Sequence, residues 1–110
     1  MITFLEHLEV ERNLSQLTIR NYGHYLRRFV AWLQQKGQSQ ITDFDPDLLR
    51  SYRLYLARYT DEHGAALSKK TQSYHMIALR SWLKWLIKND LPVMNPEKID
   101  LPKGESQSMR

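Results

Sequence analysis

The sequence predicts an all-α protein, a bundle of four helices followed by an extended C-terminal segment. Four stretches carry apolar residues at spacings of three and four, the period of a helix that buries one face. Residues that cap helices stand at the start of three stretches (Ser15, Asp45 and Ser68), and glycines follow two of them (Gly37 and Gly64). No stretch alternates polar and apolar residues for long enough to indicate a strand.

The first two helices follow from this spacing. One is expected over roughly residues 2–12, with Leu5 and Leu8 facing inward. The second is expected over about residues 15–36, and Gly37 ends it as a glycine after a helix commonly does. Its buried stripe is expected to consist of Ile19, Tyr22, Leu26, Phe29 and Leu33.

The third and fourth helices have equally clear starts. Asp45-Pro46 is a cap followed by a proline in the first turn, so the third helix begins there. The fourth is expected over about residues 68–89. The buried stripes are expected to be Leu49, Tyr52, Leu56 and Tyr59 in the third helix, and Met76, Leu79, Leu83 and Leu86 in the fourth.

The C-terminal segment has a different composition. Pro92 and Pro96 break the fourth helix, and the residues after Leu101 are mostly turn formers and polar side chains. We therefore expect an extended linker with a single turn near Glu97-Lys98, mobile from about Lys103 onward.

Two of the expected helices repeat one pattern 53 residues apart. Ser15 and Ser68 each precede an apolar stripe as an N-cap does, and Thr18 and Thr71 follow three residues later. A helix start offers free N–H donors and the positive end of a dipole. Two matching starts therefore predict a shared anionic ligand.

The charge is sorted along the chain. The formal net charge is +4, with +4 in each of the segments 15–37 and 65–91, −2 in each of 1–14 and 38–64, and none in 92–110. Sorting of this kind attracts nucleic acid, with an affinity that falls as salt rises. The alternative is that the basic helix faces only keep the protein soluble.

Composition excludes several kinds of site. The chain has no cysteine, so it has no disulfide, thiolate zinc site or cysteine nucleophile. Its four histidines lack metal-ligand spacing, and no glycine-rich phosphate loop occurs. No apolar run reaches the roughly 20 residues of a membrane span, and the N-terminus lacks the order of a signal peptide. We expect one soluble cytoplasmic domain without metal, cofactor or membrane partner.

An ordered series of motifs covers nearly the whole chain. In the first half it consists of Phe4-Leu5, Glu11-Arg12-Asn13-Leu14-Ser15, Thr18-Ile19, Tyr22, Leu26-Arg27, Phe29 and Trp32-Leu33. In the second half it consists of Leu67-Ser68-Lys69-Lys70-Thr71, Ala78-Leu79-Arg80-Ser81, Trp85-Leu86, Asn95-Pro96 and Leu101-Pro102-Lys103. The series resembles the N-terminal core-binding domain of tyrosine recombinases, the phage-integrase and Xer-type family.

The resemblance implies a four-helix, SAM-like orthogonal bundle that grips one face of duplex DNA with its second and fourth helices. Catalysis in that family resides in a second domain. Residues 1–91 are thus expected to form the DNA-binding domain, and residues 92–110 a linker toward a catalytic domain absent from this chain. The implied partners are double-stranded DNA, that catalytic domain and neighbouring recombinase subunits. The chain is not expected to be an enzyme by itself.

The expected DNA contacts lie at the two helix starts, on the sides away from the buried stripes. They are Arg20, Asn21 and His24 in the second helix, and Lys69, Lys70 and Tyr74 in the fourth. Thr18 and Thr71 either contact phosphate or only complete the caps.

Other residues have more than one interpretation. Arg27 and Arg80 share one repeat position and either contact phosphate or lock the bundle through a carboxylate such as Glu9 or Asp47, with the structural role favoured. Arg28, Lys84 and Lys88 are expected to be solvated. The three tryptophans are expected to be core residues, with the alternative that one is exposed where a neighbouring subunit packs.

Two other functions fit the sequence. One is a helical protein-interaction module whose exposed aromatic residues bind a partner helix. The other is a standalone DNA-binding regulator without catalysis.

Overall fold

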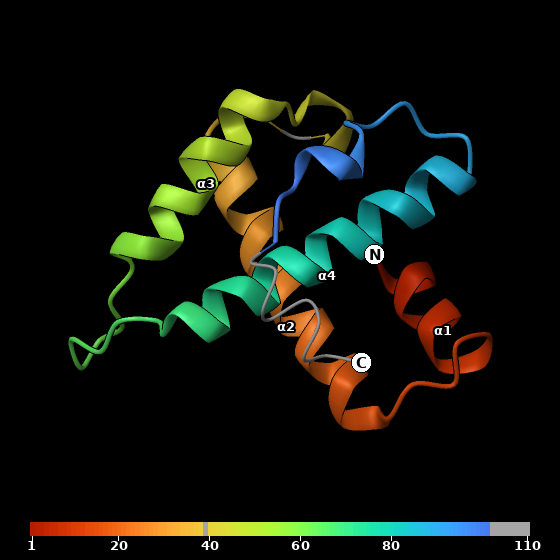
Figure 1. Cartoon of the computed structure of the whole chain (residues 1–110), viewed down its shortest axis with the longest axis horizontal. Helices are drawn as coiled ribbons and strands as arrows, with labels where there is room; N and C mark the ends of the chain where they lie inside the picture. The colour runs from red at the N-terminus through yellow and green to blue at the C-terminus, as the bar shows by residue number, and fades with distance from the viewer. Residues whose placement is uncertain (39, 102–110) are drawn as a thin grey trace.

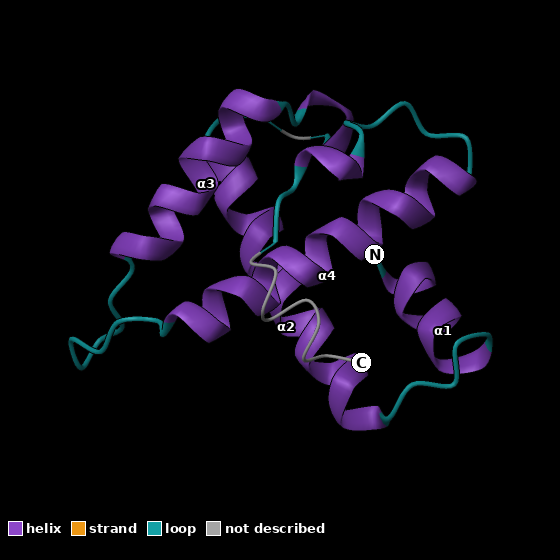
Figure 2. Cartoon of the chain, in the orientation of Figure 1, coloured by secondary structure: helices purple, strands orange, loops and turns teal. Residues whose placement is uncertain are grey.

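The structure, a computed structural model, describes residues 1–38 and 40–101. Its four α-helices are α1 (Ile2–Val10), α2 (Gln16–Gln35), α3 (Pro46–Arg58) and α4 (Lys69–Lys88), with two 3₁₀ turns, η1 (Ile41–Asp43) and η2 (Pro96–Lys98) (Figures 1 and 2). In the described part of the chain, the only β pairing is an isolated bridge between Thr60 and Ala66. The predicted all-α, four-helix fold is confirmed. The expected mobility from Lys103 onward lies outside the described residues.

The helix starts are where the capping residues predict them. Ser15 Oγ accepts a hydrogen bond from the Thr18 amide at 3.1 Å, and Ser68 Oγ accepts one from the Thr71 amide at the same distance. Asp45 Oδ1 caps α3 in the same way, accepting from the Leu48 amide at 2.9 Å. Each bond satisfies one of the backbone donors that a helix start leaves free.

The core forms where α2 and α4 cross near the middle of the bundle (Figure 1). Phe29 of α2 is 1% exposed and meets Tyr52 of α3 and Phe44 at ring-centroid distances of 5.1 and 4.9 Å. Both pairs are edge-to-face, the geometry that aromatic rings prefer. The predicted stripes of α2, α3 and α4 supply most of the remaining buried side chains.

The inward face of α1 differs from the expectation. Phe4 and Leu8 are buried at 1% and 2% exposure, whereas Leu5 is only half-buried. Phe4 and Leu8 lie one turn apart and share one face, which places Phe4 5.6 Å from the Trp85 ring. Leu5 packs against the core as expected but stays partly exposed, and the central position belongs to Phe4, which the expectation did not include.

Gly23 explains how α1 approaches α2. A Cβ atom at this position would lie 3.3 Å from Leu5 Cδ1 and 3.1 Å from Arg27 Nη1. A glycine inside a helix costs about 1 kcal/mol relative to alanine. A side chain at this position would be tight against both neighbours, which would have to move by a few tenths of an ångström.

The segment that follows α4 returns to the bundle as far as residue 101. Ile99 is 2% exposed, and Val93, Met94 and Leu101 pack against the core. Arg53 Nη2 of α3 donates a hydrogen bond to the Asp100 carbonyl oxygen at 2.7 Å. The single turn expected near Glu97-Lys98 is present as η2. The apolar residues after α4 do not recur at a helical or strand spacing, so the sequence pattern could not predict that they pack against the bundle.

The two long helices also match at their ends. The Gln38 amide donates to the Leu33 carbonyl at 3.1 Å, and the Leu91 amide donates to the Leu86 carbonyl at 3.0 Å. This closing bond requires a residue with positive φ, which is Gly37 (φ +82°) after α2 and Asp90 (φ 67°) after α4. Asp90 also places a negative charge at the negative end of the helix dipole.

We predict that Asp90→Gly stabilises the domain by ~0.5–1 kcal/mol, because glycine adopts this conformation without strain and the unfavourable charge is removed. Chemical denaturation at pH 7 measures the change. The reciprocal Gly37→Asp should destabilise the domain, since its side chain would meet no neighbouring atom and only strain and charge would act. A loss of stability in Asp90→Gly would contradict this account of the helix end.

Candidate nucleic-acid interface

The crossing of α2 and α4 brings their N-terminal halves together. Between them lies a shallow depression of about 140 Å³. Thr18 and Asn21 of α2 line it together with Tyr74 of α4. The floor is formed by Tyr22, Tyr25 and Ile77. Tyr74 thus shares one surface with Asn21, which lies 53 residues before it in the sequence.

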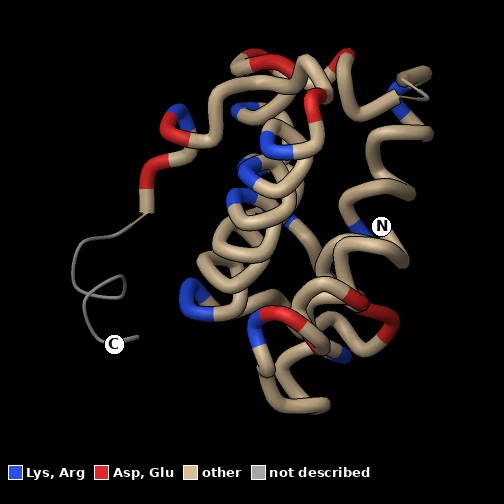
Figure 3. Tube along the Cα trace, turned by 90° about the vertical axis from the view of Figure 1, so that its right-hand side faces the viewer, with Lys and Arg blue, Asp and Glu red and all other residues tan. Residues whose placement is uncertain are grey.

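The N-terminal halves of both helices also carry basic side chains. Arg20 and His24 of α2 and Lys69 and Lys70 of α4 are all exposed. The first turn of each helix contains no acidic residue, so nothing offsets the positive end of either dipole. In Figure 3, Lys and Arg positions run down the middle of the view, and Asp and Glu positions lie mainly around its edges. Both helix starts therefore present positive charge at the surface.

The two threonines complete the caps. Ser15 Oγ donates to Thr18 Oγ1 at 2.9 Å, and Ser68 Oγ donates to Thr71 Oγ1 at 3.1 Å. In this arrangement each threonine oxygen accepts a bond, and its own proton is free to donate outward. The capping role is therefore present in both helices. The phosphate contact predicted for both threonines is compatible with it.

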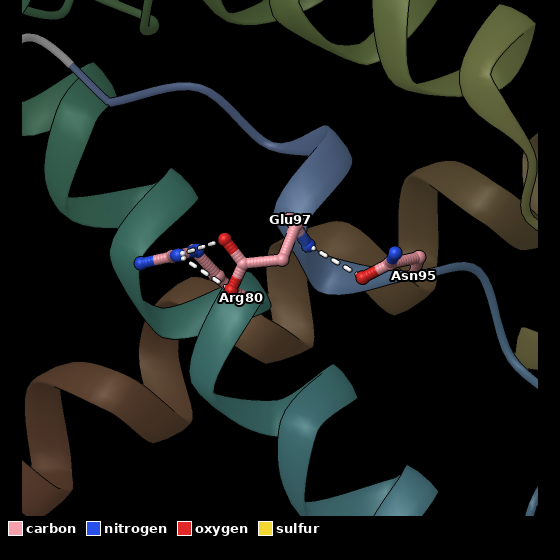
Figure 4. Close-up of polar contacts among 3 residues, drawn as sticks. All are labelled: Arg80, Asn95 and Glu97. Atoms are coloured by element: carbon pink, nitrogen blue, oxygen red, sulfur yellow. Dashed lines mark hydrogen bonds and ion pairs between the residues drawn. The ribbon is translucent and has the colours of Figure 1, made fainter.

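Arg80 has a structural partner. Its Nη2 donates to both carboxylate oxygens of Glu97, at 3.1 and 3.0 Å, and the Asn95 side chain accepts from the Glu97 amide at 2.9 Å (Figure 4). This ion pair joins α4 to η2. The structural alternative thus applies to Arg80, with Glu97 as the carboxylate instead of Glu9 or Asp47.

Arg27, at the equivalent repeat position, behaves differently. It is exposed, and within the described residues it forms no ion pair. Together with His24 it lines a groove between α2 and α3. Of the predicted site residues, three thus line the depression, His24 and Arg27 line this groove, and Arg80 is paired with Glu97. The other four line neither hollow: Arg20, Lys69, Lys70 and Thr71.

A polar link between α2 and α4 was missed in the sequence. Arg28 Nη1 of α2 donates to Nε2 of the buried His75 at 3.2 Å, and His75 Nδ1 donates to the Thr71 carbonyl at 2.8 Å. The Arg28 guanidinium also lies 4.5 Å from the Tyr59 ring centroid, in cation–π geometry. The expectation that Arg28 is merely solvated was wrong, because the helix crossing turns its side chain inward. His75 lies one turn after Thr71 and directly before the stripe residue Met76. This position was the sequence signal that could have predicted its burial.

These bonds fix the protonation state of His75. Burial lowers the pKa of His75 to about 4, although the bond to the Thr71 carbonyl acts in the opposite direction. The ring is thus neutral at pH 7, with its proton on Nδ1 and its Nε2 lone pair facing Arg28.

The remaining expectations concern exposed lysines and tryptophans. Lys84 and Lys88 are exposed as expected. Trp32 and Trp82 are core residues at 3% and 6% exposure, while Trp85 is half-buried beside α1.

Two further features were searched for in the described part of the chain. No group of three or more His, Cys, Asp or Glu side chains there is arranged to hold a metal ion. None of the described helices combines the length and hydropathy needed to cross a bilayer.

Comparison with known proteins identifies the fold family. Residues 1–90 match the family described as "Phage integrase, N-terminal SAM-like domain". The chain belongs to this family. The resemblance to tyrosine recombinases and the SAM-like fold class are thereby confirmed.

The relatives of this SAM-like domain are bacterial recombinases. "Tyrosine recombinase XerC" of Bacillus subtilis is 34% identical over 105 residues, which cover 94% of this chain and 33% of the relative. "Tyrosine recombinase XerC 2" of Ralstonia nicotianae is 32% identical over 87 residues, covering 78% of this chain and 25% of the relative. The chain spans about a third of the length of the XerC of Bacillus subtilis. No solved structure matches it.

We predict that His75→Gln costs less stability at pH 4.5 than at pH 7. The pKa of His75 in the folded domain, about 4, lies below its ordinary value of 6.5. The unfolded chain therefore binds the proton first, and the stability that neutral His75 contributes is complete above pH 6.5 and is lost as pH falls toward 4.

Urea denaturation of both proteins at the two pH values measures this difference. Carboxylate titration is common to both proteins and cancels. If His75→Gln lowers the free energy of unfolding equally at pH 7 and pH 4.5, His75 is not buried and neutral as described.

Proposed function

We propose that this domain binds duplex DNA as the core-binding part of a site-specific tyrosine recombinase or integrase. The observation that carries the proposal is the meeting of Thr18, Asn21 and Tyr74 in one depression, between two helix halves that also carry exposed basic side chains. Membership of the SAM-like family and the names of the relatives support the class of function.

Each residue type suits a part of DNA recognition. Arg20, Lys69 and Lys70 provide positive charge for phosphates, which sets most of the affinity without reading sequence. Asn21 and Tyr74 line the depression and are the candidates for base contact. An asparagine can pair with the adenine edge through two hydrogen bonds, and an aromatic ring can contact the thymine methyl group.

We assign strand cleavage and rejoining to a separate catalytic domain of the same protein. Nothing around the tyrosines of this domain favours a nucleophile. Burial raises the pKa of Tyr52 well above its usual range, which is the opposite of activation. The catalytic domain and neighbouring recombinase subunits are the proposed protein partners, and the proposed location is the bacterial cytoplasm, on DNA.

A protein-interaction module is the second candidate. Ile2 and Val10 of α1 expose 71% and 77% of their surface, more than apolar residues usually do. If the domain is a protein-interaction module, it should not bind DNA with an affinity that falls steeply as salt rises. One titration with duplex DNA at two salt concentrations therefore separates the two functions.

We predict that Lys70→Glu or Arg20→Glu lowers duplex affinity about tenfold, because each replaces a phosphate contact by a repulsion. Fluorescence anisotropy at several salt concentrations measures the affinity and its salt slope, and each substitution should reduce the slope by about one. Arg58→Glu is the control, since Arg58 is exposed in the last turn of α3, a helix to which neither start belongs. An equal loss in Arg58→Glu and Lys70→Glu would mean that diffuse charge, and not a shaped face, binds the DNA.

Substitutions at the depression should instead alter sequence preference. Asn21→Ala and Tyr74→Ala should each change the discrimination between base pairs at one position by about 1–3 kcal/mol. Selection from a randomised duplex library before and after substitution measures it. If all sequences lose affinity equally, these residues contact only the backbone.

A further inference from the structure

A groove of about 350 Å³ runs between α2 and α3, and its lining is basic and aromatic. His24, Arg27 and Arg28 of α2 form one side, and Tyr55 and Tyr59 form the other. None of the described residues that line it is an aspartate or a glutamate. Guanidinium, imidazole and phenol N–H and O–H groups are all donors, so the groove suits an anion.

Positive charge is concentrated at this groove. The pKa of His24 is lowered, first by its partial burial and then by the positive charges of Arg28 and Arg27. The part of this lowering that the two arginines cause reflects a positive potential beside His24. An anion bound here would neutralise it.

The groove is also preorganised. Arg28 is held on one side by its bond to His75 and on the other by the Tyr59 ring. A donor that is fixed before binding loses less side-chain entropy when the ligand arrives. Arg27 is exposed and free of ion pairs within the described residues, so its charge is available to a ligand.

The groove continues the face formed by the helix starts. Asn21 lines the depression between α2 and α4, and His24, one turn further along α2, lines the groove. Seven residues separate Asn21 from Arg28, roughly 10 Å along the helix. One strand of a duplex presents a phosphate about every 3.4 Å along the duplex axis, so different phosphates of one duplex can reach the two hollows.

We infer that the groove between α2 and α3 is a second anion site that takes a phosphate group of the DNA backbone, adjacent to the duplex bound at the two helix starts. This inference rests on the proposed DNA-binding function. It adds Arg27, Tyr55 and Tyr59 to the surface that contacts DNA and extends that surface onto α3.

Two neighbouring glutamines provide a matched test. Gln35 is exposed and lines the groove, whereas Gln34 is exposed and lies on another side of α2, beside Phe29 and Trp82. Gln35→Glu and Gln34→Glu introduce the same charge in the same last turn of α2, with the same effect on the helix dipole. Only the first places the charge in the groove.

Duplex binding should fall about threefold to tenfold in Gln35→Glu and less than about twofold in Gln34→Glu, at low salt where exposed charges are least screened. Equal affinities of the two variants would overturn the inference. Lys70→Glu, measured in parallel, separates the failures. A loss in Lys70→Glu with no difference between the glutamine variants would remove only the groove, whereas no loss in any variant would also remove the proposed function.

A second arm identifies the source of the phosphate. Inorganic phosphate is titrated into the free domain at constant ionic strength, with the His24 ring signals followed by NMR. A shift in the wild type and in Gln34→Glu that is weakened in Gln35→Glu would show that the groove binds phosphate by itself. If phosphate binds but the two variants bind DNA equally, a free anion occupies the groove and the DNA contact is overturned. If Gln35→Glu weakens DNA binding but free phosphate causes no shift in any variant, the groove binds phosphate only as part of a duplex, which supports the inference.

Discussion

The crossing of α2 and α4 is the contact on which the rest of the structure depends. Leu26 of α2 and Leu79 and Leu83 of α4 are each 0% exposed, and Arg28 and His75 join the same two helices through a hydrogen bond. The apolar side chains supply the burial energy, whereas the Arg28–His75 bond has one directional geometry and restricts how the helices are rotated. Because both starts lie on one side of this crossing, their caps, dipoles and basic residues can act on a single ligand.

Features set by neighbouring residues were predictable. The caps at Ser15, Asp45 and Ser68 and the end at Gly37 depend on side chains and backbone angles within a few residues, so the helix bounds follow closely from the sequence. Most of the buried stripes of α2, α3 and α4 follow from their spacing, but Ile19, Tyr22 and Tyr59 are only half-buried. Tyr59 also lies just after the end of α3. The inward face of α1 was only half predicted, because on a short helix both Leu5 and Phe4 satisfy the pattern.

Contacts between distant residues were not predictable. The Arg28–His75 bond joins residues 47 apart, and the Arg80–Glu97 pair joins residues 17 apart. Periodicity shows which face of a helix each side chain occupies, but not which element packs there. The repeat does not predict these contacts either. Arg27 and Arg80 hold the same repeat position, yet Arg27 lines an open groove and Arg80 forms an ion pair with Glu97 of η2.

The candidate site divides in the same way. Thr18, Asn21 and Tyr74 could be chosen from the sequence because each lies at a fixed offset from a helix start. The groove that continues the face could not, because Tyr55 and Tyr59 come from α3 and the residue after it, in a segment whose net charge is negative. Its donors become a surface only when α3 packs beside α2.

The central claim is that the two helix starts act as one DNA-binding face. A ¹⁵N-labelled domain titrated with duplex DNA tests it most directly, with backbone amide shifts followed residue by residue. The account predicts that residues 15–24 and 68–75 shift together, at the same DNA concentration and with the same salt dependence. Shifts confined to one helix start, or concentrated on α1, would contradict it.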